Sequence, residues 1–174
     1  THAAFGALKT DRSPIFSILL GPSPGSETMF GNDRASIRQY YVEVWRKACA
    51  GEVLDPMERI VAEVIADHPE YQPMLSSEDA SALQRDYTPE EGQTNPFLHM
   101  GMHIALREQA GADRPPGIRD LIDRLVAQIG DRLEAEHRLM EPLGETLWEA
   151  QRAGTQPDEF AFMERVRKLV NDRG

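Results

Sequence analysis

Apolar residues recur at helical spacing along most of the chain from Asn32 onward. Residues three or four positions apart share one face of an α-helix, so this spacing predicts helices that each bury one face. Asn32 or Asp33 can cap the first of these helices, and Gly51 ends it. Its predicted buried residues are Ile37, Tyr41, Val44, Trp45 and Ala48.

Sequence signals mark both ends of the second predicted helix. Asp55 can cap it, Pro56 suits its first turn, and Glu58 completes a capping box. Pro69 disfavours helical geometry in the residue before it, so this helix is expected to end near His68. Its start and its end are therefore both predicted from local sequence.

A long stretch without periodicity, residues 69–94, follows this helix and contains the turn-rich sequence DYTPEEGQT. One short helix is predicted within it, around 78–83. Loops of this length in compact domains usually serve a function or lie docked on the surface. We therefore predict a long 69–94 loop.

Helical periodicity returns at Asn95, where a cap followed by Pro96 opens a helix that Gly111 closes. A second long run of apolar residues at helical spacing, the long stripe, follows the RPPG sequence. Pro142 is expected to kink or interrupt the helix there, because proline lacks a backbone N–H donor. A last helix begins at Pro157 and Asp158. The long stripe comprises Ile118, Ile122, Leu125, Ile129, Leu133, His137 or Glu136, Met140, Leu143 and Leu147. The inward residues of the last helix are predicted to be Phe160, Met163, Val166, Leu169 and Val170.

No segment alternates with the period of a β-strand, so the predicted fold is all-α, a helical bundle of about five to six helices. The chain of 174 residues suits one domain, and we assign residues 29–174 to it. Residues 1–28 are rich in Pro, Gly and Ser around one short apolar segment. This composition predicts a flexible N-terminal extension. That extension fits a docking arm, a translated upstream region or a vector-derived tail.

The formal net charge of -10 argues against nucleic acid and anionic membranes as partners, because their phosphates require clustered Lys and Arg. Apolar stretches are too short to span a bilayer, and no signal peptide is recognisable. The single cysteine, Cys49, cannot form an intramolecular disulfide and is expected to be a small buried hydrophobe. These features predict a cytoplasmic protein.

Histidines provide the candidate chemistry. His99 and His103 lie four positions apart and project from one helix face, as in hemerythrin-like bundles. On the next helix Glu134, His137 and Glu141 share a face, and Glu134-x-x-His137 matches half of the di-iron carboxylate pattern. His68 lies at the end of a third helix. Imidazole and carboxylate ligands suit iron, zinc or another transition metal.

The predicted metal site therefore takes His99, His103 and His137 as imidazole ligands and Glu141 as the carboxylate. Glu134 is assigned as a ligand or as a partner that fixes a histidine tautomer, and His68 completes the candidate set. The alternative is structural: the histidines bind carbonyls, and Glu134, Glu136 and Glu141 form a solvated face with Arg132 and Arg138. Neither alternative is excluded by sequence.

Other functions have weaker support. No Gly-rich loop follows a strand, so no nucleotide cofactor is expected. A non-enzymatic interaction protein or accessory subunit is the competing hypothesis, with a protein partner bound through the N-terminal arm or the 69–94 loop. Tyr40, Tyr41 and Trp148 favour it, because they cannot all face one core. The sequence decides neither enzymatic activity nor the oligomeric state.

Several sequence blocks resemble an uncharacterised bacterial family, domain of unknown function 1841. They include MFGNDR, VWRKACAG, LDPMERIVAEVIADHPEY, EEGQTNPFLHMGMHIALREQ, DRPPGIRDL and GDRLEAEHRLMEPLGETLWEAQRAG. The resemblance implies that Met29 is the usual start. It also implies histidines in relatives at the positions of Gln72 and Leu133. If relatives bind metal through such a fuller set, the site in this chain suits one metal ion better than two.

Overall fold

A computed structural model describes residues 30–76 and 95–172 of the chain. The described residues form helices without any strand, which confirms the predicted all-α bundle. The helices are α2 (Phe30–Cys49), α3 (Pro56–Ala66), α4 (Gln72–Ser76), α6 (Pro96–Ala112), α7 (Ile118–Ile129), α8 (Arg132–Ala153) and α9 (Glu159–Asn171). Among them, no helix combines the length and the apolar character needed to cross a membrane.

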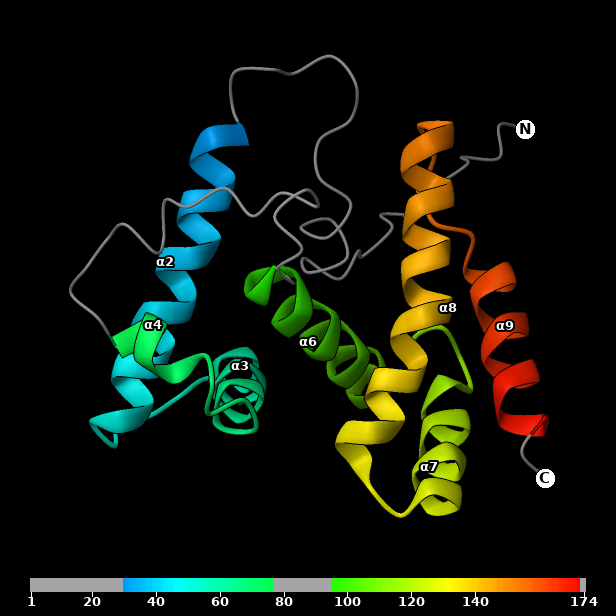
Figure 1. The fold of residues 1–174 in the computed structure, drawn as a ribbon, viewed down its shortest axis with the longest axis horizontal. Helices are drawn as coiled ribbons and strands as arrows, with labels where there is room; N and C mark the ends of the chain where they lie inside the picture. The colour runs from blue at the N-terminus through cyan, green and yellow to red at the C-terminus, as the bar shows by residue number, and fades with distance from the viewer. Residues whose placement is uncertain (1–29, 77–94, 173–174) are drawn as a thin grey trace, which may run out of the picture.

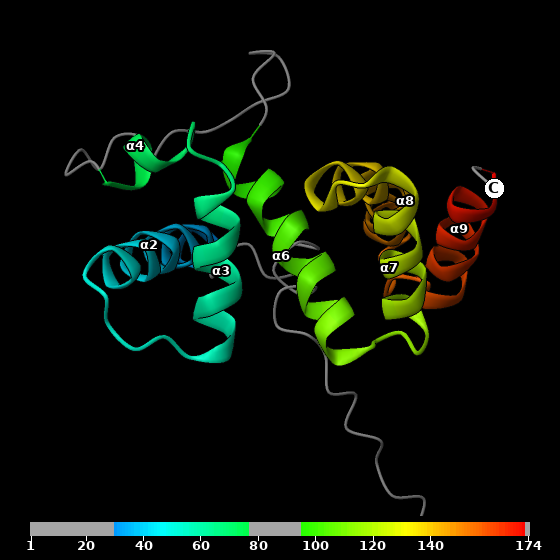
Figure 2. The same ribbon diagram turned by 90° about the horizontal axis from the view of Figure 1, so that it is seen from below.

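Helix α6 lies in the middle of the molecule (Figures 1 and 2). On one side it packs against α3, which in turn packs against α2. On the other side it packs against α7 and α8, and α9 covers both of these. The amino-terminal helices therefore meet the carboxyl-terminal helices mainly at α6, and groups at this junction come from distant parts of the sequence.

One continuous hydrophobic core runs through this arrangement. Val61, Val64 and Ile65 of α3 are fully buried, as are Met100 and Ile104 of α6. The same cluster continues through the buried faces of α7, α8 and α9. Burial of apolar area of this kind, rather than intrinsic helix propensity, supplies most of the stability of such helices.

The predicted helix starts at Asp55 and Asn95 are confirmed. The carboxylate of Asp55 accepts from the Glu58 amide at 2.8 Å, and the Glu58 carboxylate accepts from the Asp55 amide at 2.9 Å. The side-chain oxygen of Asn95 accepts from the amides of Phe97 and Leu98 at 3.0 and 3.2 Å. Both caps satisfy amides that have no partner within their own helix.

Replacing the Asn95 cap is expected to loosen the start of α6. Asn95→Ala removes the acceptor of two amides and should lower the free energy of unfolding by about 1 kcal/mol. Asn95→Asp keeps an oxygen at the same position and should change it by less than about 0.5 kcal/mol. Urea denaturation of both variants tests this, and equal losses would show that the cap contributes nothing.

The long stripe from Ile118 to Leu147 is divided differently from our prediction. It breaks at Gly130, whose positive φ of 81° ends α7, and Asp131 caps α8. Helix α8 then continues through Pro142, where we predicted a kink or a break. The periodicity persists across the break because α7 and α8 both bury their apolar faces in the same core, so spacing alone cannot reveal the turn.

Three predictions about burial and helix starts are wrong. Cys49 is exposed rather than buried. In α9, Phe160 is 74% exposed whereas Phe162 is 1% exposed, so Phe162 is the inward residue of the first turn. Helix α2 begins at Phe30, so Asn32 and Asp33 lie inside it instead of capping it.

The predicted loop 69–94 contains the short helix α4, which its irregular sequence did not indicate. Trp45 of α2 donates a hydrogen bond to the hydroxyl of Ser76 at 3.2 Å, and Leu75 is buried. These tertiary contacts favour a helix where local periodicity is absent. The short helix predicted around 78–83 and the extension 1–28 lie outside the described residues.

Candidate metal centre

Four histidines from three separate parts of the fold converge at the junction. His68 follows the end of α3, His99 and His103 lie one turn apart on α6, and His137 lies on α8. One ring nitrogen from each lies within 4.8 Å of the others. The structure thus brings together four of the six predicted ligands, including His68, the member predicted from the end of a different helix.

His68 and His103 form the buried half of this cluster, with 2% and 0% of their surface exposed. Nδ1 of His68 lies 2.7 Å from the carbonyl oxygen of Val64, and Nδ1 of His103 lies 2.8 Å from Oε2 of Glu136. Carbonyl and carboxylate oxygens only accept hydrogen bonds, so each Nδ1 carries the ring proton. In the neutral imidazole each Nε2 is then the acceptor, and among the described residues neither Nε2 has a hydrogen-bond partner.

His99 and His137 form the partly exposed half of the cluster. Their Nε2 atoms lie 3.4 Å apart, which is long for a hydrogen bond. Two ligands of a tetrahedral metal ion with bonds of about 2.0–2.1 Å are separated by about 3.4 Å. The spacing of these two nitrogens therefore fits one edge of a tetrahedral site.

Two of the clustered histidines disfavour the protonated imidazole. Burial, together with the neighbouring imidazoles His103, His68 and His137, lowers the pKa of His99 to about 4. Burial also lowers the pKa of His103, and this effect outweighs the opposing hydrogen bond to Glu136. His99 and His103 are consequently neutral at pH 7, which is the form that binds metal.

Glu136 is a buried carboxylate directly behind His103. Besides the His103 ring, it accepts from Arg107 through Nε at 2.9 Å and Nη2 at 3.0 Å, and from Arg132 at 3.0 Å. Burial alone would raise the pKa of Glu136, but these hydrogen bonds outweigh it and lower the pKa to about 2. Arg107 also binds Asp67 at 2.7 Å, beside His68 in the chain.

Our interpretation of Glu136 as part of a solvated acidic face is wrong. The residue lies three positions before Leu139 and seven before Leu143, both fully buried, so it shares their face. The sequence allowed this outcome, because helical spacing places either Glu136 or His137 on the buried face of the helix. Which of the two is buried depends on the groups that pack against that face, and the partner of Glu136, Arg107, comes from a different helix.

The two predicted acidic ligands lie outside the histidine group. Glu134 pairs with Arg138 at 2.6 Å, and its other oxygen is 4.0 Å from Nδ1 of His137. It is thus placed beside a histidine rather than among the converging nitrogens. Glu141 is exposed on α8. Sequence reasoning missed Tyr71, whose ring stacks on His68 with centroids 5.6 Å apart.

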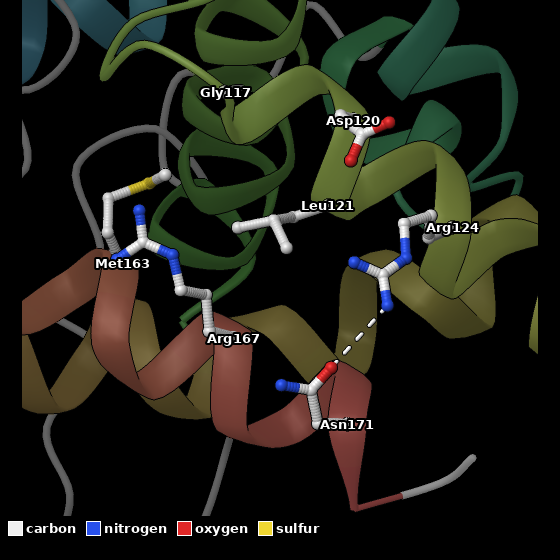
Figure 3. A pocket seen from close by; sticks show the side chains of 7 residues that line it. All are labelled: Gly117, Asp120, Leu121, Arg124, Met163, Arg167 and Asn171. Atoms are coloured by element: carbon white, nitrogen blue, oxygen red, sulfur yellow. Dashed lines mark hydrogen bonds between the residues drawn. The ribbon is translucent and has the colours of Figure 1, made fainter.

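A second candidate for binding is a shallow hollow between α7 and α9 (Figure 3). Arg124 reaches across it to the side-chain oxygen of Asn171 at 3.4 Å, while Arg167 pairs with Glu164. Asp120 and both arginines are exposed. The hollow holds no buried titratable group, so the histidine cluster is the stronger candidate site.

The surfaces that prompted the partner hypothesis are only partly described. Tyr41 is buried, whereas Tyr40 and Trp148 are 38% and 58% exposed, so the three aromatics do not share one core. Arg152 covers the Trp148 ring, with its guanidinium carbon 5.2 Å from the ring centroid. The N-terminal arm lies outside the described residues. Binding of a partner there stays a prediction.

Comparison with known proteins gives a family and no function. No curated protein and no solved structure matches the chain significantly. A family model described as Domain of unknown function (DUF1841) matches residues 33–168. This range includes all four clustered histidines together with Arg107 and Glu136. Because the match covers most of the sequence, the chain belongs to the family named domain of unknown function 1841.

Proposed function

We propose that the protein binds one transition metal ion between α3, α6 and α8, through His68, His99, His103 and His137. The observation that carries this proposal is the pair of buried Nε2 atoms of His68 and His103, for which the described part of the chain offers no hydrogen-bond partner. Nδ1 of each ring faces an oxygen acceptor, so in the neutral imidazole the proton lies on Nδ1 and Nε2 presents a lone pair. A buried polar atom without a partner costs about 1–3 kcal/mol, and a cation would satisfy both at once.

The donor set indicates the class of metal. Four imidazole ligands suit zinc, copper, nickel or ferrous iron, whereas magnesium and calcium prefer carboxylate, carbonyl and water oxygens. No carboxylate of the described residues belongs to the converging group. The predicted role of Glu141 as the carboxylate ligand is therefore not part of this proposal.

The geometry supports one ion rather than two. The side-chain amide of Gln72 donates a hydrogen bond to the backbone carbonyl of Ile65 at 3.2 Å. The side chain of Leu133 has no atom that can bind a metal. These are the positions where the family resemblance implied further histidines. With four imidazoles the site can complete a tetrahedral shell from protein alone, which is typical of sites that hold a metal rather than activate water. We therefore favour metal storage, sensing or stabilisation over metal-assisted hydrolysis.

Metal analysis of protein purified without a histidine tag tests the proposal. We expect about one equivalent of a transition metal, or uptake of about one equivalent of added Zn²⁺. His68→Ala and His103→Ala should each reduce the content below about a tenth of an equivalent, because each removes a buried donor. Glu141→Ala is the matched control and should retain the metal. Wild-type protein below about a tenth of an equivalent, before and after adding Zn²⁺, Ni²⁺, Cu²⁺ and Fe²⁺, would contradict the proposal.

A further inference from the structure

We infer that Glu136, fixed in place by Arg107, is the positioning residue of the metal centre and sets its affinity by orienting His103. This inference rests on the proposed metal binding and assigns a role to a buried carboxylate that is not itself a ligand. Glu136 and Arg107 lie on α8 and α6, the two helices that also supply three of the four imidazoles.

The hydrogen bonds leave Glu136 little freedom to move. Both of its oxygens receive hydrogen bonds from the Arg107 guanidinium, and Oε2 also receives the Nδ1 proton of His103. The remaining Nη2 contact of Arg107 goes to Asp67, beside His68 in the chain. This network fixes the ring of His103 so that its bare Nε2 lies among the other histidine nitrogens.

His103 binds a carboxylate through Nδ1, which is a stronger outer partner than His68 or His137 has. His68 binds a neutral carbonyl through Nδ1, and the carboxylate nearest to Nδ1 of His137 is 4.0 Å away. A carboxylate bound to Nδ1 raises the basicity of an imidazole and holds it in one tautomer, and loss of such a partner typically costs about 10–100-fold in metal affinity. We therefore expect His103 to be the strongest donor of the site.

The competing interpretation is that Glu136 only compensates the buried charge of Arg107. Two variants separate these roles. Glu136→Gln alone removes the buried countercharge of Arg107 and leaves it only the partly exposed Asp67, so it weakens both folding and metal binding. Glu136→Gln combined with Arg107→Gln removes both charges, so neither buried charge is left without its partner. The double variant therefore tests positioning without the uncompensated charge.

Titration with Co²⁺, monitored by the visible absorption of the bound ion and by competition with a chelator, gives the affinity. We expect the single and the double variant to bind Co²⁺ about 10–100-fold more weakly than wild type. Glu134→Gln is the matched control on the same helix, because its side chain is nearly half exposed and its carboxylate is beyond hydrogen-bond distance from His137. It should change the affinity by less than about threefold.

A double variant that folds and binds Co²⁺ with wild-type affinity would overturn the inference while leaving metal binding intact. Failure of the wild type to bind Co²⁺ or Zn²⁺ would instead overturn the proposed function. The wild type also gives a test that depends on no variant: nitrogen-15 spectra of the metal-free protein should show His103 protonated at Nδ1. Protonation at Nε2 would overturn the inference.

Discussion

Zinc at saturating concentration is expected to raise the Tm of the metal-free protein by roughly 8–16 °C. A ligand that binds only the folded state at about 1,000 times its Kd adds about 4 kcal/mol of stability. In a chain of this size each kcal/mol shifts the Tm by about 2–4 °C. The ion would engage the buried nitrogens of His68 and His103, which no group of the described residues satisfies.

Differential scanning calorimetry of chelator-treated protein, with and without Zn²⁺, measures this shift. His103→Gln should lose most of it, whereas Glu141→Ala should retain it because Glu141 lies outside the histidine group. Adding excess chelator to the loaded wild type should return the Tm to its starting value. A shift of the same size in His103→Gln as in the wild type would contradict binding at this cluster.

The stabilisation should be distributed across the junction rather than confined to one helix. His68 follows α3, whereas His137 comes from α8, and α6 supplies the ligands between them. A bound ion would therefore couple the amino-terminal helices to the carboxyl-terminal ones. Hydrogen exchange should slow in α3 and α8 together on loading, because opening either helix away from α6 would break metal bonds.

Arg107→Leu is expected to lower the free energy of unfolding of the metal-free protein by about 3–5 kcal/mol, because one partner of a buried ion pair is removed. Glu136 would then lose its bidentate partner while remaining buried, and of the donors among the described residues it would keep His103 and the largely exposed Arg132. The leucine keeps much of the packing volume, so most of the loss comes from the carboxylate that has lost its buried cation.

Arg138→Leu is the matched control for this substitution. Arg138 binds Glu134 at 2.6 Å, but both side chains are nearly half exposed. Water and salt screen such a pair, so its loss should cost less than about 1 kcal/mol. Urea denaturation with a chelator present compares the two variants. Equal losses would mean that the buried network around Glu136 contributes no more to stability than a surface ion pair.

The sequence by itself determined where three of the described helices begin. Caps act within one turn, so Asp55, Asn95 and Asp158 indicated the starts of α3, α6 and α9 without reference to any other part of the chain. The spacing of His99 and His103 likewise placed two imidazoles on one face, because helix geometry fixes that relation locally. The class of the fold and half of the histidine cluster were therefore predictable.

Only the tertiary structure decided the rest of the site. Whether His68 reaches α6, whether the stripe of α8 passes through Glu136 or through His137, and whether Glu141 turns inward all depend on contacts between distant segments. The burial of Glu136 is tolerable because Arg107, 29 positions earlier, lies opposite it. Local periodicity contains no information about such partners, since the free energy of burying a charge is set by the groups that surround it in space.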